Sequence, residues 1–289
     1  MRRKFLYAGM AIALVYWTQI LNAGVLDGKD IKAWWKFETK NGGEPIGDSV
    51  SPGDVLDDSS PNGIGLEVMS PEPMQVVPRD SKKALHFDGE TTYLQEEESA
   101  GSTESRIHLT DKFTLAAWFR IEKPPANINL ISKNDWAGPS ERCFDFGVTQ
   151  AQNSRLQLFG KTETGEKPKE EIPDKTWIST GGGPIPIGTW QFLAVTFDGK
   201  EVRFYNNGQL TNTVQTPFTT MRKEPVPVTV GSNLCNGKGA AIFQGEIGEA
   251  FILGEALTHV DIKKLYEETN PSKSGEQQKE LDDLIKNLK

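Results

Sequence analysis

The sequence predicts an all-β fold, a two-sheet antiparallel β-sandwich followed by short C-terminal helices. Short apolar runs recur along the chain with turn dipeptides between them, such as Asp198-Gly199 and Asn207-Gly208. Asp-Gly and Asn-Gly tolerate the positive φ values of tight hairpins, so they mark antiparallel neighbours. Helical periodicity is found only near the C-terminus. Regular short strands without interleaved helices are typical of a sandwich.

The N-terminal residues 1–23 have the pattern of a secretory signal peptide. A positive start at residues 2–4 precedes a mostly apolar stretch, and residues 21–23 offer a cleavage site. We therefore expect an exported protein, periplasmic, at the cell surface or secreted. An uncleaved anchor is the alternative, because the stretch approaches the about 20 residues that span a bilayer. The run RRKFL leaves open whether the Sec or the twin-arginine route is used.

The charge balance of the chain is acidic. The 289 residues carry a formal charge of −8, and removal of residues 1–23, which hold three basic residues and no acidic one, makes it −11. Such a surface repels nucleic acid and anionic lipid. We expect no nucleic-acid partner, and membrane attachment only if the N-terminal segment stays uncleaved. The remaining length is compatible with one sandwich domain and a tail.

The strands are predicted from alternation and from the turn residues that follow them. The run 113–121 (FTLAAWFRI) places every second apolar side chain on one face. Segments 41–79 and 161–186 are polar and rich in Gly and Pro, which predicts long loops, the first with one strand at most. The predicted strands are 84–87, 93–94, 113–121, 190–197, 202–205, 226–230 and 246–253.

Two helices are predicted after the last strand. Thr258 can cap the first, with Asp261 three residues later in a capping-box pattern, and the helix stops before Asn270-Pro271. The second would present Leu281, Leu284, Ile285 and Leu288 on one face. We therefore divide the chain into a signal peptide (1–23), a sandwich domain (30–269), and a linker with an amphipathic C-terminal helix (270–289).

Eight short motifs in register carry a family resemblance. They stand at residues 35–38 (WKFE), 58–63 (Asp-Ser-Ser-Pro-Asn-Gly), 84–89 (ALHFDG), 113–118 (FTLAAW), 131–133, 188–199, 204–208 and 243–257. Together they resemble the laminin-G-like domains of the concanavalin A-like lectin/glucanase superfamily, over about residues 33–268. The resemblance implies a jelly roll of two antiparallel sheets. It also implies an exported binding or adhesion module, often for glycans, and in many members a structural calcium.

Catalysis is not expected, although Glu246 and Glu249 look like an acid pair. A retaining glycosidase needs two carboxylates about 5–5.5 Å apart. In a regular strand, residues three apart point to opposite faces, so these two should be separated. Gly248 stands where the family's acidic position would be. The charge runs 96–98 and 166–171 are interpreted as solvated surface.

Calcium is the one cofactor that the resemblance implies. Gly248 removes a charged ligand from the family site, and Asp58, Asp88 and Glu249 remain as candidate ligands. Asp88 is explained equally well by the turn that it forms with Gly89. A buried Glu249 would need a partner, for which a basic side chain or a backbone amide of the early loops is expected.

Sugar binding requires exposed aromatic faces flanked by planar polar groups. Trp136 lies in a polar turn after a strand, and Trp177 lies in the long loop 161–186. The alternative for each is that the tryptophan packs its own loop onto the body. The polar candidates are Asn134, Asp135, Arg142 and Asn233.

The two cysteines leave one question open. Cys143 and Cys235 both fall near predicted strand ends, and in an exported protein they could form a disulfide or remain two free thiols.

From the sequence we expect an exported, non-catalytic module that recognises a glycan or a cell-envelope component. The alternative is a structural or adhesion subunit that docks on another exported protein, and a glycoside hydrolase is the third hypothesis.

Overall fold

The computed structural model describes residues 24–98, 104–123, 127–137, 142–161 and 176–272. In these residues it has 21 strands and one α-helix. The expected signal peptide and the expected second C-terminal helix lie outside them. Among the described helices, none combines the length and the apolarity needed to cross a membrane.

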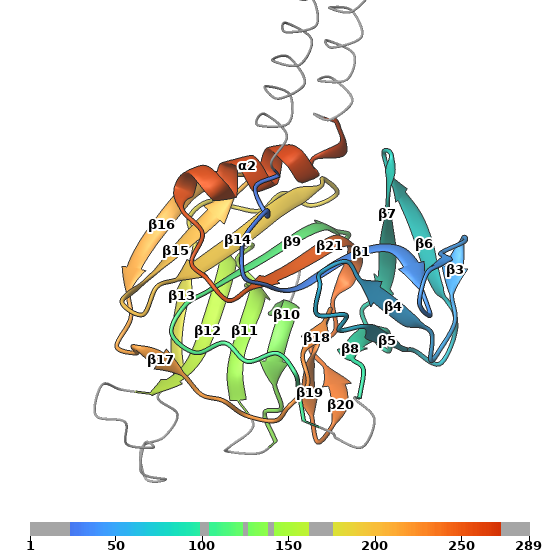
Figure 1. Ribbon diagram of the computed structural model, residues 1–289, viewed down its shortest axis with the longest axis horizontal. Helices are drawn as coiled ribbons and strands as arrows, with labels where there is room; N and C mark the ends of the chain where they lie inside the picture. The colour runs from blue at the N-terminus through green and yellow to red at the C-terminus, as the bar shows by residue number, and fades with distance from the viewer. Residues whose placement is uncertain (1–23, 99–103, 124–126, 138–141, 162–175, 273–289) are drawn as a thin grey trace, which may run out of the picture.

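The strands form two antiparallel layers (Figure 1). The first sheet runs from β16 (Gln209–Gln215) through β15 (Glu201–Asn206), β14 (Gln191–Phe197) and β9 (Phe113–Ile121) to β21 (Gln244–Leu253). The far side of β21 pairs with both β7 (Lys82–Asp88) and β1 (Ile31–Lys40). Beyond them lie β6 (Met74–Arg79), β3 (Ser49–Val50) and β2 (Glu44–Pro45).

The second sheet lies against the first. It runs from β4 (Val55–Asp58) through β5 (Leu66–Met69), β8 (Tyr93–Glu96) and β18 (Thr229–Val230) to β10 (Ile128–Asn134). It continues through β11 (Arg142–Val148) and β12 (Ser154–Lys161) to β13 (Thr176–Thr180), with β17 (Thr220–Met221) also on β12. Because β1 also pairs with β4, the two sheets join along one edge. A small hairpin, β19 (Asn233–Cys235) and β20 (Lys238–Ala240), stands beside β10. The predicted jelly-roll sandwich is confirmed.

The main core fills the space between the sheets. Its largest fully buried side chains include Trp35, Phe87, Phe113, Phe119, Phe144 and Phe197. The predicted alternation in β9 is confirmed, because Leu115, Ala117 and Phe119 face this core while Ala116 and Trp118 face the opposite side. That opposite side of the first sheet is also covered, which explains why almost the whole strand is buried.

Helix α2 (His259–Thr269) covers the outer side of the first sheet (Figure 1). The predicted capping box is present, since Asp261 N donates to Thr258 Oγ1 at 3.2 Å and Thr258 N donates to Asp261 Oδ2 at 3.2 Å. Ile262 and Leu265 are buried against Trp118 of β9. The helix ends at Thr269, before Asn270, as predicted.

Several predicted boundaries were wrong. Segment 41–79 holds five strands, β2 to β6, four of them only two or four residues long, too short to show alternation in the sequence. The predicted strand 226–230 is reduced to Thr229–Val230 because Pro225 and Pro227 have no backbone N–H to donate to a ladder. Segment 161–186 contains β13, so it is not one continuous loop.

The expected separation of Glu246 and Glu249 is also wrong. In the ladder with β9, Glu246 is opposite Arg120, Ile247 is opposite Phe119, and Glu249 is opposite Trp118. The register shifts between Ile247 and Glu249, so Gly248 is the extra residue of a β-bulge. Because Arg120 and Trp118 are two positions apart, both carboxylates face the outer side of the first sheet.

The buried carboxylate of Glu249 has the basic partner that the sequence predicted. It is fully buried and accepts from Arg79 Nη2 at 2.7 Å, from Trp34 Nε1 at 3.1 Å, and from Lys82 Nζ. The guanidinium of Arg79 also lies 4.7 Å from the ring centroid of Trp118. Burial lowers the pKa of Arg79, and the charge of Glu249 opposes that shift.

Gly248 makes room for this ion pair. A Cβ at position 248 would lie 2.8 Å from Arg79 Nε and 3.0 Å from its Cδ. We therefore expect Gly248→Ala to lower the free energy of unfolding by about 1–3 kcal/mol through overpacking. Chemical denaturation of both proteins measures this change. Unchanged stability would show that Arg79 moves aside at no cost.

Candidate ligand-binding site

The candidate site is built where the end of β10 contacts the β19–β20 hairpin. Asn236 and Gly237 form the hairpin turn with φ values of 51° and 72°, the left-handed conformation that an Asn-Gly turn favours. Asp135, the residue after β10, accepts from Asn236 N at 2.9 Å and from Gly237 N at 2.6 Å. Trp136 N donates to Leu234 O at 3.0 Å. Asp135 therefore fixes the hairpin against the end of β10.

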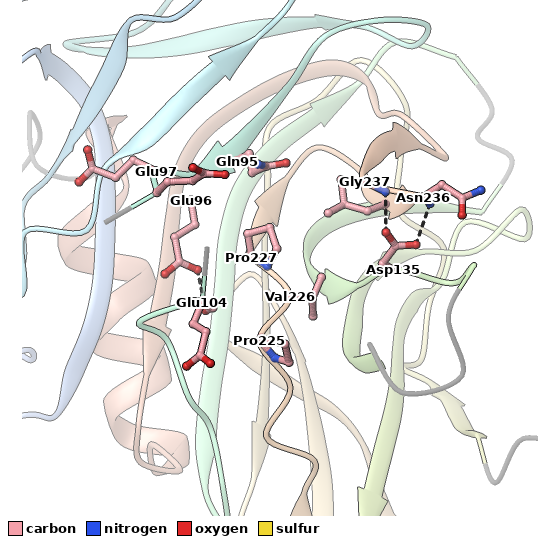
Figure 2. A pocket seen from close by; sticks show the side chains of 13 residues that line it. Gln95, Glu96, Glu97, Glu104, Asp135, Pro225, Val226, Pro227, Asn236 and Gly237 are labelled. Carbon is pink, nitrogen blue, oxygen red and sulfur yellow. Dashed lines mark hydrogen bonds between the residues drawn. The ribbon is translucent and has the colours of Figure 1, made fainter. Parts of the chain in front are cut away.

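A pocket of about 450 Å³ lies beside this connection (Figure 2). Figure 2 shows Asp135 with Asn236 and Gly237 on one side, Glu96 and Glu104 on the other, and the segment 225–227 between them. The lining residues come from segments 95–98, 104–105, 225–227 and 236–237, with Asp135 and Leu234. The pocket thus depends on the fold, because three distant parts of the chain meet there: residues 95–98 with 104–105, Asp135, and residues 225–227 with 234–237.

The pocket is strongly acidic. Its lining includes Glu96, Glu97, Glu98, Glu104 and Asp135, and among the described residues that line it none is Lys or Arg. Carboxylate oxygens accept hydrogen bonds from hydroxyl and ammonium groups and repel anions. The chemistry of this pocket therefore suits a neutral, hydroxyl-rich ligand or an amine.

Glu96 is a structural member of this wall. It is 3% exposed and accepts from Ser105 Oγ at 2.7 Å, Arg106 N at 2.6 Å and Val228 N at 3.1 Å. The interpretation of residues 96–98 as solvated surface was therefore wrong for Glu96. Its burial follows from the donors that residues 105, 106 and 228 bring to it, and a charge run in the sequence cannot show this.

The structure brings most of the predicted binding residues to this part of the fold. Trp136 is 51% exposed, while Asn134 is 3% exposed and donates from Nδ2 to Asp145 Oδ2 at 2.7 Å. Arg142, at the start of β11, donates from Nη2 to the Trp136 carbonyl. Asn233 opens β19 and is buried. Of the predicted polar residues, Asp135 lines the pocket.

Trp177 lies elsewhere. It sits on β13, opposite Leu158 of β12, and β12 and β11 separate β13 from β10. The strand that carries Trp177 is therefore not a neighbour of β10, the strand that precedes Trp136.

The pocket residues that sequence reasoning missed include Glu104, the prolines 225 and 227, Leu234 and the turn 236–237. The Asn-Gly pair was a readable turn signal. Its place beside Asp135 was not readable, since Asn236 stands 101 positions after Asp135 in the chain.

The three candidate calcium ligands do not form one ligand set. Asp58 accepts from Trp34 N, Ser60 N and Ile64 N at 2.8, 2.8 and 3.0 Å, and Glu249 is used by Arg79. Asp88 caps its own turn. Among the described residues, three His, Cys, Asp or Glu side chains bring their ligand atoms within 4.8 Å of one another. Asp58, Asp88 and Glu249 are not members of this group. In the described part of the chain, the three carboxylates therefore do not converge on one common ion position.

Asp88 illustrates the turn chemistry. It accepts from Glu90 N and Thr91 N, both at 2.8 Å, and from Thr91 Oγ1 at 2.6 Å. Burial alone would raise the pKa of Asp88, but these hydrogen bonds hold it well below its usual range. The charged carboxylate therefore stabilises the fold above about pH 4, and this contribution is lost as the pH falls below that value.

Replacing Asp88 with Asn should accordingly have a pH-dependent effect. We expect Asp88→Asn to lower the melting midpoint at pH 7, and the difference from the parent to shrink at pH 3, where Asp88 takes up a proton in the unfolded parent while the folded parent keeps the charge. Thermal melts of both proteins at the two pH values measure this. An equal difference at both would contradict the assigned role of the charge.

The cysteines are both free thiols in the structure, Cys143 buried and Cys235 half-buried. Burial raises the pKa of the Cys143 thiol to about 11. The disulfide alternative is not the arrangement that this fold shows.

The sequence and the fold agree with one known family. The sequence model of the concanavalin A-like lectin/glucanases superfamily matches residues 88–263. The chain belongs to this superfamily. No curated protein sequence matches it detectably.

Solved structures share its fold at low sequence identity. Domain 4 of AbnA, an extracellular arabinanase from Geobacillus stearothermophilus solved with arabinotriose, is 16% identical with a TM-score of 0.56, over 82% of this chain and 98% of that chain. The botulinum neurotoxin serotype G binding domain is 15% identical, with a TM-score of 0.55, over 82% and 50%. The binding domain of paraclostridial mosquitocidal protein 1 is 15% identical, with a TM-score of 0.54, over 74% and 49%. The chain spans about half of the length of these two toxin domains.

Proposed function

We propose that this protein is an exported, non-catalytic carbohydrate-binding module whose ligand occupies the pocket beside Asp135. One observation carries the proposal: the exposed indole of Trp136 stands next in the chain to a residue that lines an acidic pocket of about 450 Å³. An aromatic face beside convergent polar groups is the arrangement that sugar recognition needs. The shared fold with a domain solved with arabinotriose supports the same class of ligand.

The charge of the pocket narrows the ligand class. A neutral sugar donates its hydroxyls to carboxylates, whereas a sialylated or uronic-acid sugar would place its own carboxylate against Glu98 and Glu104. We therefore propose that the protein prefers neutral or amino sugars over acidic ones.

The absence of catalysis in this proposal rests on the state of the carboxylates. Glu249 is fully buried and cannot touch a substrate. Both oxygens of Glu246 are held by Arg120, at 2.9 Å from Nε and 2.8 Å from Nη2. In the pocket, Asp135 and Glu96 already accept hydrogen bonds from the chain. A glycosidase needs one carboxyl as acid and another free to attack or to activate water.

A glycan array that holds neutral, amino and acidic oligosaccharides tests the proposal. We expect the purified protein to bind a neutral or amino glycan, and Trp136→Ala to lose most of that binding. Leu210→Ala is the matched control, because Leu210 on β16 is 46% exposed and lies on the other sheet. Absence of any glycan ligand would leave the docking-subunit alternative standing, and equal binding by Trp136→Ala would remove the proposed site.

A further inference from the structure

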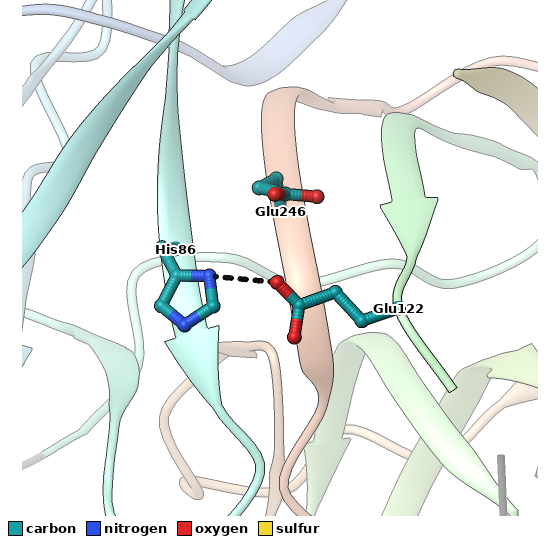
Figure 3. Close-up of side chains that lie close together, drawn as sticks. All are labelled: His86, Glu122 and Glu246. Carbon is teal, nitrogen blue, oxygen red and sulfur yellow. Dashed lines mark ion pairs between the residues drawn. The ribbon is translucent and has the colours of Figure 1, made fainter. Parts of the chain in front are cut away.

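A second cluster of chemically active side chains lies on the first sheet, away from the pocket. His86 of β7 is directly opposite Glu246 of β21, and Glu246 is directly opposite Arg120 of β9. Glu122 is two residues beyond Arg120 and points to the same cluster (Figure 3). The ligand atoms of His86, Glu122 and Glu246 all lie within 4.8 Å of one another. Three neighbouring segments of the chain thus bring one imidazole and two carboxylates together.

We propose that His86, Glu122 and Glu246 bind a divalent transition-metal ion, with Zn²⁺ as the representative ion. An imidazole nitrogen combined with carboxylate oxygens suits zinc and its neighbours, whereas calcium and magnesium take oxygen ligands. Three protein ligands would leave a further coordination position for water. This site is independent of the proposed sugar pocket, which lies on the second sheet.

The spacing of the first two ligands fits such an ion. His86 Nδ1 lies 3.3 Å from Glu122 Oε1. Zinc bonds to nitrogen and oxygen of about 2.0–2.2 Å in a tetrahedral arrangement place two ligand atoms about 3.4 Å apart. The side chains of His86 and Glu122 are 30% and 36% exposed, so an ion can reach them from solvent. Glu246 on β21 is buried and forms the inner side of the site.

Arg120 would compete with this ion for the carboxylate of Glu246. It holds Glu246 through two hydrogen bonds, at 2.9 and 2.8 Å, and this contact raises the pKa of Arg120 above its ordinary value. The Arg120 side chain is 35% exposed, so it can leave Glu246 and remain hydrated. Metal binding therefore replaces the guanidinium of Arg120 with the metal ion at Glu246. Removal of Arg120 should accordingly tighten metal binding.

Isothermal titration with ZnCl₂ tests this on tag-free protein from which chelator has been removed. We expect one Zn²⁺ per chain, a loss of affinity of about 100-fold or more in His86→Ala, and at least about tenfold in Glu122→Gln. Arg120→Gln should bind Zn²⁺ more tightly than the parent. His259→Ala, which removes an exposed histidine at the start of α2, is the control and should bind like the parent.

Thermal melts provide a second readout, since an ion bound to the native state raises the midpoint. At the same Zn²⁺ concentration, the midpoint should rise in the parent and in His259→Ala, and should rise clearly less in Glu122→Gln. Because Glu122 is exposed, this variant decides the matter even if His86→Ala folds poorly. Absence of Zn²⁺ binding, or binding that survives both ligand substitutions, would overturn the proposal.

Discussion

Replacing Glu249 with alanine is expected to lower the free energy of unfolding by about 3–5 kcal/mol, because it leaves a buried charge without its partner. Arg79 is 2% exposed, and besides its bond to Glu249 it donates from Nη2 to Thr269 O at 3.4 Å. Its Nε and Nη1 have no hydrogen-bond partner among the described residues. Urea denaturation of the parent and the variant measures the loss.

Glu246→Ala is the matched control for that experiment. It removes a carboxylate from the same strand and the same face, but its partner Arg120 has a side chain that is 35% exposed and can be hydrated. We expect a loss of about 1 kcal/mol or less for this pair. The double variant Glu249→Leu with Arg79→Met should recover at least half of the loss caused by Glu249→Ala. Equal losses for Glu249→Ala and Glu246→Ala would contradict the assigned difference in burial.

The second large effect is expected on ligand affinity. Once the glycan array supplies a ligand, Trp136→Ala and Asp135→Ala should each weaken its binding by about tenfold or more, which corresponds to about 1.4 kcal/mol or more. The reasons differ. Trp136→Ala would remove the aromatic face on which the sugar ring stacks. Asp135→Ala would instead leave the N–H groups of Asn236 and Gly237 without their acceptor and loosen one wall of the pocket.

The two variants should separate in stability. Trp136 is 51% exposed, so its replacement should change the free energy of unfolding by no more than about 0.5 kcal/mol. Asp135→Ala should cost about 1–3 kcal/mol, because a buried acceptor that serves the hairpin is removed. Titration calorimetry and denaturation of each variant check both values. If Asp135→Ala weakens glycan binding and Trp136→Ala does not, the pocket binds the glycan without a contribution from Trp136.

The sequence predicted several long elements of this fold, such as β9, β14 and β21, because their signals are local. Alternation over nine residues defined β9, and the turns Asp198-Gly199 and Asn207-Gly208 defined the hairpins β14–β15 and β15–β16. The two-residue strands β2 and β3 could not be predicted, because two residues cannot show a period. Their existence depends on partners elsewhere in the chain.

The bulge at Gly248 shows a signal that was present and misinterpreted. A glycine inside a strand pattern often marks a bulge, and here the bulge moves Glu249 to the side that regular alternation denies it. The need of Glu249 for a basic partner was predictable from burial alone. The identity of that partner was not, since Arg79 is 170 positions away.

The candidate site was predictable only in part, for the same reason. Asp135 and Trp136 stood out because a polar turn after a strand carried an aromatic residue. The facing wall, with Glu96 and the segment 225–227, is assembled by tertiary structure. Trp177 looked equivalent in the sequence, but its strand lies three places from β10 in the second sheet.

Nuclear magnetic resonance tests the central claim most directly, by locating the bound glycan on ¹⁵N-labelled protein. If the pocket is the binding site, titration of the glycan should shift the amide signals of Asp135, Trp136, Asn236 and Gly237, together with the indole N–H of Trp136. Signals from the outer side of the first sheet, such as those of Arg203 and Leu210, should remain in place. Shifts concentrated on that outer side, with the signals of Asp135, Trp136, Asn236 and Gly237 unchanged, would contradict the account.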